Sequence, residues 1–74
     1  MPALPRISGL KAIKVFEILG FRVVRQRGSH VVLRKEKMGC VIPVHKELAV
    51  GTLRSAIRQA GITPIEFVNA YKSR

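Results

Sequence analysis

The sequence predicts an α+β fold in the order α-β-β-β-α with a short C-terminal helix, in which two helices cover one face of a three-stranded antiparallel sheet. Helical apolar periods flank three runs rich in β-branched residues. Only short loops separate these runs, and short loops join antiparallel neighbours. The chain has 74 residues. A chain of this size buries only about 60% of its unfolded surface, so we expect one domain, residues 1–74.

The first helix is expected to begin after Ser8 and to end at Gly20. Ser8 is a typical N-cap, and Gly20 is suited to close the helix. Between them, Lys11, Lys14 and Glu17 fall on one side of the helical wheel. The opposite, core-facing side carries Ala12, Ile13, Val15, Phe16 and Leu19.

Three strands are expected in the middle of the chain. The first covers Phe21–Arg27 and the second His30–Arg34, with Gly28-Ser29 as the turn between them. The segment Lys35–Gly39 is polar and ends in glycine, so we expect a loop there. The third strand follows at Cys40–Val44.

Alternation along these strands predicts which side chains share a face of the sheet. In the first strand the odd-numbered residues, including Val23 and Arg25, are expected on one face. Arg22 is expected on the other face with the even-numbered residues. In the second strand, His30 and Arg34 are expected to project together.

The C-terminal third predicts two more helices. The segment Thr52–Ala60 is amphipathic and is stopped by Gly61. A capping box of Thr63 and Glu66, with Pro64 at the first helical position, opens a short last helix. If the two longer helices cover one face of the sheet, the other face stays open to a partner. Small double-stranded-RNA-binding domains have this architecture.

The charge of the chain favours a polyanionic partner. Fourteen Lys and Arg residues against four Glu and no Asp give a net charge of +10 and a pI of about 11.3. A pI above ~9 is typical of small nucleic-acid-binding domains. A solvated basic surface, or an acidic protein partner, is the alternative. The four glutamates are scattered, which argues against a nuclease that holds two metal ions with clustered carboxylates.

Other features favour a cytoplasmic protein without a membrane partner. No apolar run reaches the roughly 18 residues that span a bilayer, and the first residues do not resemble a signal peptide. Cys40 is the single cysteine, so no internal disulfide is possible. We expect it to be a small core residue in a reducing compartment.

The most informative stretch is Arg25-Gln26-Arg27-Gly28-Ser29-His30. Arginines hold phosphate, glycine allows close approach of the backbone, and imidazole is the side chain whose ordinary pKa lies near neutrality. These residue types together point to recognition or chemistry at a phosphodiester.

With this stretch and several others, the chain resembles the HicA toxins of bacterial and archaeal toxin–antitoxin systems, also grouped as YcfA-like. The matching pieces are Ser8-Gly9, Gly20-Phe21, Arg25 to His30, Pro43-Val44-His45, Leu48, Gly51-Thr52-Leu53, Gln59-Ala60-Gly61-Ile62 and Thr63-Pro64. The resemblance implies a double-stranded-RNA-binding-like fold and a metal-independent endoribonuclease, or mRNA interferase. It also implies catalysis by His30 and neutralisation by a HicB antitoxin. Val50 departs from the pattern, since many relatives have proline or lysine there.

Metal-free cleavage of RNA needs a group that moves protons, and His30 is the strongest candidate in the chain. Whether it acts as general acid or as general base stays open. Its second partner also stays open among His45, Ser29 and a lysine. The residues expected to bind RNA around it are Arg25, Arg27, Gly28, Ser29, Arg34 and Lys46. No metal ligand and no cofactor are expected.

Two other functions remain open from the sequence. A non-catalytic double-stranded-RNA-binding module would keep the charge without needing His30 for chemistry. A DNA-binding helix-turn-helix could lie within residues 53–71, with Arg54 and Arg58 on its exposed face. Three strand-like runs precede that segment, which is unlike most helix-turn-helix domains.

Overall fold

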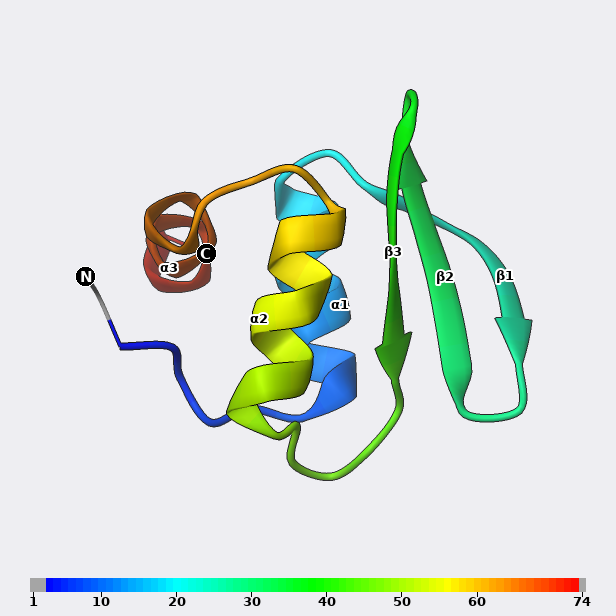
Figure 1. Ribbon diagram of the computed structural model, residues 1–74, viewed down its shortest axis with the longest axis horizontal. Coiled ribbons are helices and arrows are strands. Elements are labelled where there is room, and N and C mark those ends of the chain that lie inside the picture. The colour runs from blue at the N-terminus through cyan, green and yellow to red at the C-terminus, as the bar shows by residue number, and fades with distance from the viewer. Residues whose placement is uncertain (1–2, 74) are drawn as a thin grey trace.

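The computed structural model describes residues 3–73 and confirms the α+β class (Figure 1). The elements are α1 (Gly9–Ile18), β1 (Arg22–Arg27), β2 (His30–Lys35), β3 (Met38–Pro43), α2 (Val50–Gln59) and α3 (Pro64–Ser73). The sheet, the pair α1 and α2, and α3 follow one another as three layers, with α3 on the side of α1 and α2 that is away from the sheet.

The sheet is antiparallel with the strand order β1-β2-β3. Both hairpins have two-residue turns. Gly28-Ser29 joins β1 to β2 as predicted, and residues 36–37 join β2 to β3. The second turn is shorter than the loop expected at Lys35–Gly39, because β3 begins at Met38 and pairs with Lys35 there. The predicted strand Cys40–Val44 therefore begins too late and ends one residue too far.

The core lies between the sheet and the helices and is apolar throughout. Among the described residues, no polar or charged side chain is buried. At its centre Phe16 contacts two other rings, Phe21 at 5.5 Å and Phe67 at 5.3 Å between centroids. The strands contribute Val31, Leu33, Cys40 and Ile42, and each of these is at most 3% exposed. This confirms the prediction that Cys40 is a core residue.

The predicted starts of the first and last helices are confirmed, and α1 ends close to the expected position with Leu19 as its C-cap. The Ser8 side chain accepts a hydrogen bond from the Lys11 N–H at 3.1 Å, and Gly20 follows α1 with a φ of 101°. The side chain of Thr63 accepts from the Glu66 N–H and that of Glu66 accepts from the Thr63 N–H. These two bonds form the expected capping box. The last helix is not short, because α3 has ten residues like α1 and α2.

The start of α2 differs from the prediction. The helix begins at Val50 rather than Thr52, and its N-cap is Ala49. Ala49 has extended backbone angles suited to an N-cap, but alanine offers no side-chain acceptor to the free N–H groups of the first turn. The start of this helix is held by the Leu48 N–H, which donates to the Ile7 carbonyl at 2.8 Å, and by packing, with Leu53 and Ile57 buried against the core.

Candidate nucleic-acid interface

A β-bulge in β1 decides which of its side chains face the open side of the sheet. Val23 pairs with Leu33, which is buried on the helix-covered face, whereas Arg25 pairs with Val32 on the open face. The register shifts between these pairs and leaves Val24 as the extra residue. Directly opposite residues of an antiparallel pair point to the same face. The expectation that Val23 and Arg25 share a face is therefore wrong, because simple alternation does not count a bulge.

The same bulge gathers four arginines on the open face. Arg22 pairs with Arg34 and Arg27 pairs with His30, so all three arginines of β1 join Arg34 there. Alternation placed Arg22 on the other face, and nothing in the sequence marks the bulge. Directly opposed like charges, such as Arg22 and Arg34, cost stability. A fold that retains this pair on its surface is suited to a polyanionic ligand.

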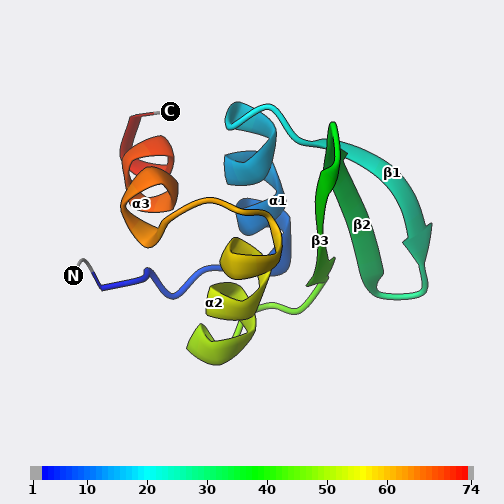
Figure 2. The same ribbon diagram turned by 45° about the horizontal axis from the view of Figure 1, so that its top comes forward.

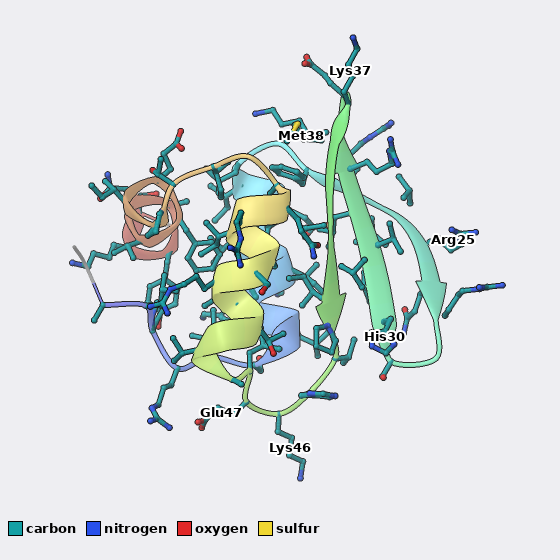
Figure 3. The ribbon with its side chains drawn as sticks, viewed as in Figure 1. Arg25, His30, Lys37, Met38, Lys46 and Glu47 are labelled. Carbon is teal, nitrogen blue, oxygen red and sulfur yellow. The ribbon has the colours of Figure 1, made fainter. Side chains whose placement is uncertain are left out.

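His30 lies in the middle strand of this face. It is the first residue of β2, with Arg27 opposite it on β1 and Pro43 opposite it on β3. The side chain is exposed, and Figure 3 shows it close to the β1–β2 turn. His30, Val32 and Arg34 are on the side opposite to buried Val31 and Leu33, which confirms that His30 and Arg34 project together.

Hydrogen bonds hold the turn next to His30. Gly28 has a φ of 56°, a conformation that costs other residues about 1–2 kcal/mol. Gln26 Nε2 donates to the Gly28 carbonyl at 3.1 Å, and the Val44 N–H donates to the Ser29 carbonyl at 2.6 Å. The second bond ties the turn to the chain that follows β3, so the backbone of His30 is fixed from two sides.

The first turn of α1 in turn supports the chain after β3. The Gly9 N–H donates to the His45 carbonyl at 2.9 Å. A Cβ at position 9 would overlap the Pro43 carbonyl, so this close approach requires glycine. His30 is thus linked through the turn, Val44 and His45 to the start of the first helix.

No acidic side chain balances the arginines of the open face. Within residues 3–73 the only ion pair joins Arg6 to Glu47 at 3.1 Å, and both partners are exposed. The other glutamates lie in α1, in the β2–β3 turn and in α3. The positive potential of the open face is therefore unopposed.

The family model described as the HicA toxin of bacterial toxin–antitoxin matches residues 9–62 of the 74-residue chain. This chain belongs to the HicA toxin family. The matched span includes the whole sheet, the β1–β2 turn and His30. Comparisons with curated proteins and with solved structures each gave no match. Family membership makes the protein the toxin of a toxin–antitoxin system, with a cognate antitoxin as its partner.

In this HicA-family toxin a hollow of about 470 Å³ lies at the outer edge of β3, where it borders the open face and reaches round the strand to Cys40 and to Gln59 of α2. On the open-face side it is bordered by Val32, Arg34 and Val41, and Gly39 adds no side chain between them. The residues lining the hollow are Val32, Arg34, Lys37, Gly39, Cys40, Val41 and Gln59. Sequence reasoning missed this hollow and Arg22, because both depend on the register of the strands.

The other predicted RNA-binding cation, Lys46, lies off the sheet. It is exposed in the loop between β3 and α2, and its side chain points away from the body of the protein (Figure 3). Lys35, by contrast, is engaged within the protein, so its ammonium group is not free to bind a ligand. Its Nζ donates to the Leu19 carbonyl at 2.8 Å and lies 6.0 Å from the centre of the Phe21 ring. This lysine caps the end of α1.

Cys40 takes no part in the chemistry of the open face. Burial raises the pKa of its thiol to about 11, so the thiol is neutral at physiological pH and a poor nucleophile.

Within residues 3–73 no group of three or more His, Cys, Asp and Glu side chains is placed to hold a metal ion. None of the helices described there is long and apolar enough to cross a membrane.

Proposed function

We propose that this toxin is an endoribonuclease that cleaves mRNA, with His30 as a general acid or base and without a metal ion. The observation that carries the proposal is the position of His30 on an open, basic sheet face. His30 is exposed directly opposite Arg27, and Arg22, Arg25 and Arg34 share its face. A group that transfers protons therefore lies among groups that bind phosphate.

The chemistry requires two proton transfers at one phosphodiester. The 2′-oxygen of the ribose loses a proton and bonds to phosphorus, and the bond from phosphorus to the 5′-oxygen breaks as that oxygen gains a proton. The products are a 2′,3′-cyclic phosphate and a 5′-hydroxyl end. His30 supplies one of the transfers, which is typically worth ~10²- to 10⁴-fold in rate. Arg27 lies nearest in register and can stabilise the negative charge that develops on the phosphorane.

The glutamates support a reaction that does not depend on a metal. Two-metal nucleases hold their ions with several carboxylates that converge on one site. Here Glu17 lies on α1, Glu36 in the β2–β3 turn, Glu47 in the β3–α2 loop and Glu66 on α3. The basic face around His30 contains none of them.

The cognate antitoxin is proposed to neutralise the toxin by covering the open face with an acidic surface. Complementary charge speeds association and fixes orientation, and four uncompensated arginines offer it a target. RNA and antitoxin would then compete for the same residues. A ternary complex of toxin, antitoxin and RNA that still cleaves would contradict this part of the proposal.

Cleavage of RNA in the presence of EDTA tests the enzyme assignment. Wild type and His30→Ala are purified in parallel, with Arg58→Ala, an exposed change on α2, as the control variant. We expect wild type and Arg58→Ala to cleave alike and His30→Ala to be slower by ~10²- to 10⁴-fold. RNA binding by His30→Ala should persist. Equal cleavage by all three proteins would mean that a contaminating nuclease is responsible and would contradict the proposal.

The same preparations separate this function from the two alternatives. A non-catalytic RNA-binding module would bind RNA with wild-type and His30→Ala protein alike and cleave with neither. A helix-turn-helix protein would bind duplex DNA more tightly than RNA at matched salt and would lose that binding in Arg58→Ala. The proposed ribonuclease shows neither pattern.

A further inference from the structure

The open face of the sheet is divided into three columns of different chemistry. The pairing of the strands places directly opposite residues in rows across the sheet. The rows are Arg22, Arg34 and Gly39; Arg25, Val32 and Val41; and Arg27, His30 and Pro43. The β1 column is wholly cationic, the β3 column is wholly uncharged, and the β2 column contains His30. Figure 2 shows β1 at the side of the sheet farthest from the helices.

We propose that this face binds a single, unpaired RNA strand that runs along β1, with its phosphates on the arginines and its bases turned toward β3. The inference rests on the proposed ribonuclease function and specifies its substrate as single-stranded RNA. It also specifies how the strand crosses the site.

The cations along β1 are spaced to match the phosphates of an extended strand. Residues two apart in a strand are separated by about 6.8 Å, which is close to the distance between successive phosphates of an extended nucleic acid strand. Arg25 and Arg27 have this separation. The bulge at Val24 makes Arg22 the next member of the same column. Three successive phosphates can therefore each meet one arginine.

An apolar surface lies beside the cations. Val32 pairs with Val41, and Val41 is 40% exposed although it is apolar. The hollow of about 470 Å³ next to Val41 has room for a nucleobase. A Cβ on Gly39 would lie 3.0 Å from the Leu33 carbonyl oxygen and 3.4 Å from Arg34 Cγ, so a side chain at this position is crowded against β2 and lies beside the hollow. The flat face of an unpaired base can cover this apolar surface and remove it from water.

His30 lies between the cationic and the uncharged columns. In a strand laid across the face in this way, the ribose lies between phosphate and base, over β2. This brings a 2′-hydroxyl near His30, where the proposed chemistry needs it. A duplex keeps its bases paired and turned inward, so it could use the arginines but not the hollow.

The test uses His30→Ala protein, so that the RNA stays intact during binding. A labelled single-stranded RNA and the same strand paired with its complement are titrated at several salt concentrations. We expect the single strand to bind at least 10-fold more tightly than the duplex. Adding Arg22→Gln should weaken binding of the single strand and reduce the slope of log K against log[salt] by ~0.7. Lys14→Gln, which removes an exposed charge on α1, should change neither.

Strands with one abasic site test the hollow without changing the protein. Scanning the abasic site along the RNA should reveal a position that costs about 10-fold in affinity, the order expected when one base no longer covers the apolar surface of the hollow. In Gly39→Leu protein, whose hollow is filled, this position should no longer matter.

The outcomes distinguish the strand path from the enzyme assignment. Equal or tighter binding of the duplex would overturn the path, as would equal losses in Arg22→Gln and Lys14→Gln, even if His30-dependent cleavage in EDTA stands. Absence of both RNA binding and cleavage in the wild-type protein would overturn the proposed function itself.

Discussion

Two parts of one sheet differ in burial. The side of β2 and β3 that faces the helices is buried, whereas β1 is exposed. The covered side carries Val31, Leu33, Cys40 and Ile42, all buried. Every residue of β1 is exposed, on both faces of the strand. The helices therefore complete a core without β1, and β1 is left to carry charge. Stability and ligand binding reside in different parts of the chain, so variants should separate the two.

The bulge and the arginines of β1 also protect an otherwise vulnerable edge. An edge strand offers unpaired backbone groups to other chains, and natural edges are blunted by bulges and by charged side chains. Val23 and Val24 are 45% and 48% exposed on this strand. The flanking arginines disfavour pairing of this apolar surface with a second copy, and on the open face the same side chains can bind phosphate.

The largest expected effect on stability comes from the helix-covered part. Phe16→Ala removes a fully buried ring that contacts Phe21 and Phe67. It should lower the free energy of unfolding by about 3–5 kcal/mol, which is most of the stability of so small a domain. Val24→Ala in β1 should change it by less than about 0.5 kcal/mol. Urea unfolding of both variants measures the contrast. A similar loss in both would mean that β1 belongs to the core.

The two hairpin turns provide a matched test of backbone strain. Gly28 has a φ of 56° and Glu36 a φ of 54°, so one turn uses glycine and the other does not. Gly28→Ala should destabilise the protein by about 1–2 kcal/mol, because a Cβ there meets only open space and the cost is conformational. Glu36→Gly should stabilise it by up to about 1 kcal/mol. Thermal unfolding measures both variants, and a shift of Tm in the same direction for both would contradict this prediction.

A smaller effect on stability is expected at the start of α2, where the N-cap Ala49 makes no side-chain hydrogen bond. Ala49→Ser supplies the missing acceptor and should raise the free energy of unfolding by about 1 kcal/mol. Because Ala49 lies outside the proposed interface, RNA binding at fixed salt should stay the same. Ala49→Gly is the control, since it fits the same backbone but adds no acceptor.

The smallest expected effect on stability comes from a change in β1, which should stabilise the fold while it weakens RNA binding. Arg22→Gln relieves repulsion from Arg34 and should stabilise the fold by about 0.2–1 kcal/mol. The same change should weaken binding of single-stranded RNA. The free energy of unfolding and the affinity for single-stranded RNA are measured on one preparation. A higher stability with a lower affinity is expected, whereas a decrease in both would indicate that Arg22 is a structural residue.

The sequence was sufficient for the order of the elements, because helical and alternating periods, the capping box at Thr63 and the glycine turns are local signals. It was also sufficient for the shared face of His30 and Arg34, which lie on one regular strand. The sequence did not predict that Arg22 lies on the open face, because the bulge at Val24 arises from pairing with β2 and has no local sequence signal. The hollow beside Gly39 likewise forms only when β2, β3 and the end of α2 come together.

The central claim is that His30 does the chemistry while the arginines around it bind the strand. It is tested most directly by measuring affinity and single-turnover cleavage of one labelled single-stranded RNA in EDTA. Wild type, His30→Gln and Arg22→Gln are compared. The claim predicts that His30→Gln cleaves ~10²- to 10⁴-fold more slowly at unchanged affinity, and that Arg22→Gln loses affinity but cleaves normally once saturated. Cleavage by His30→Gln at the wild-type rate would contradict it.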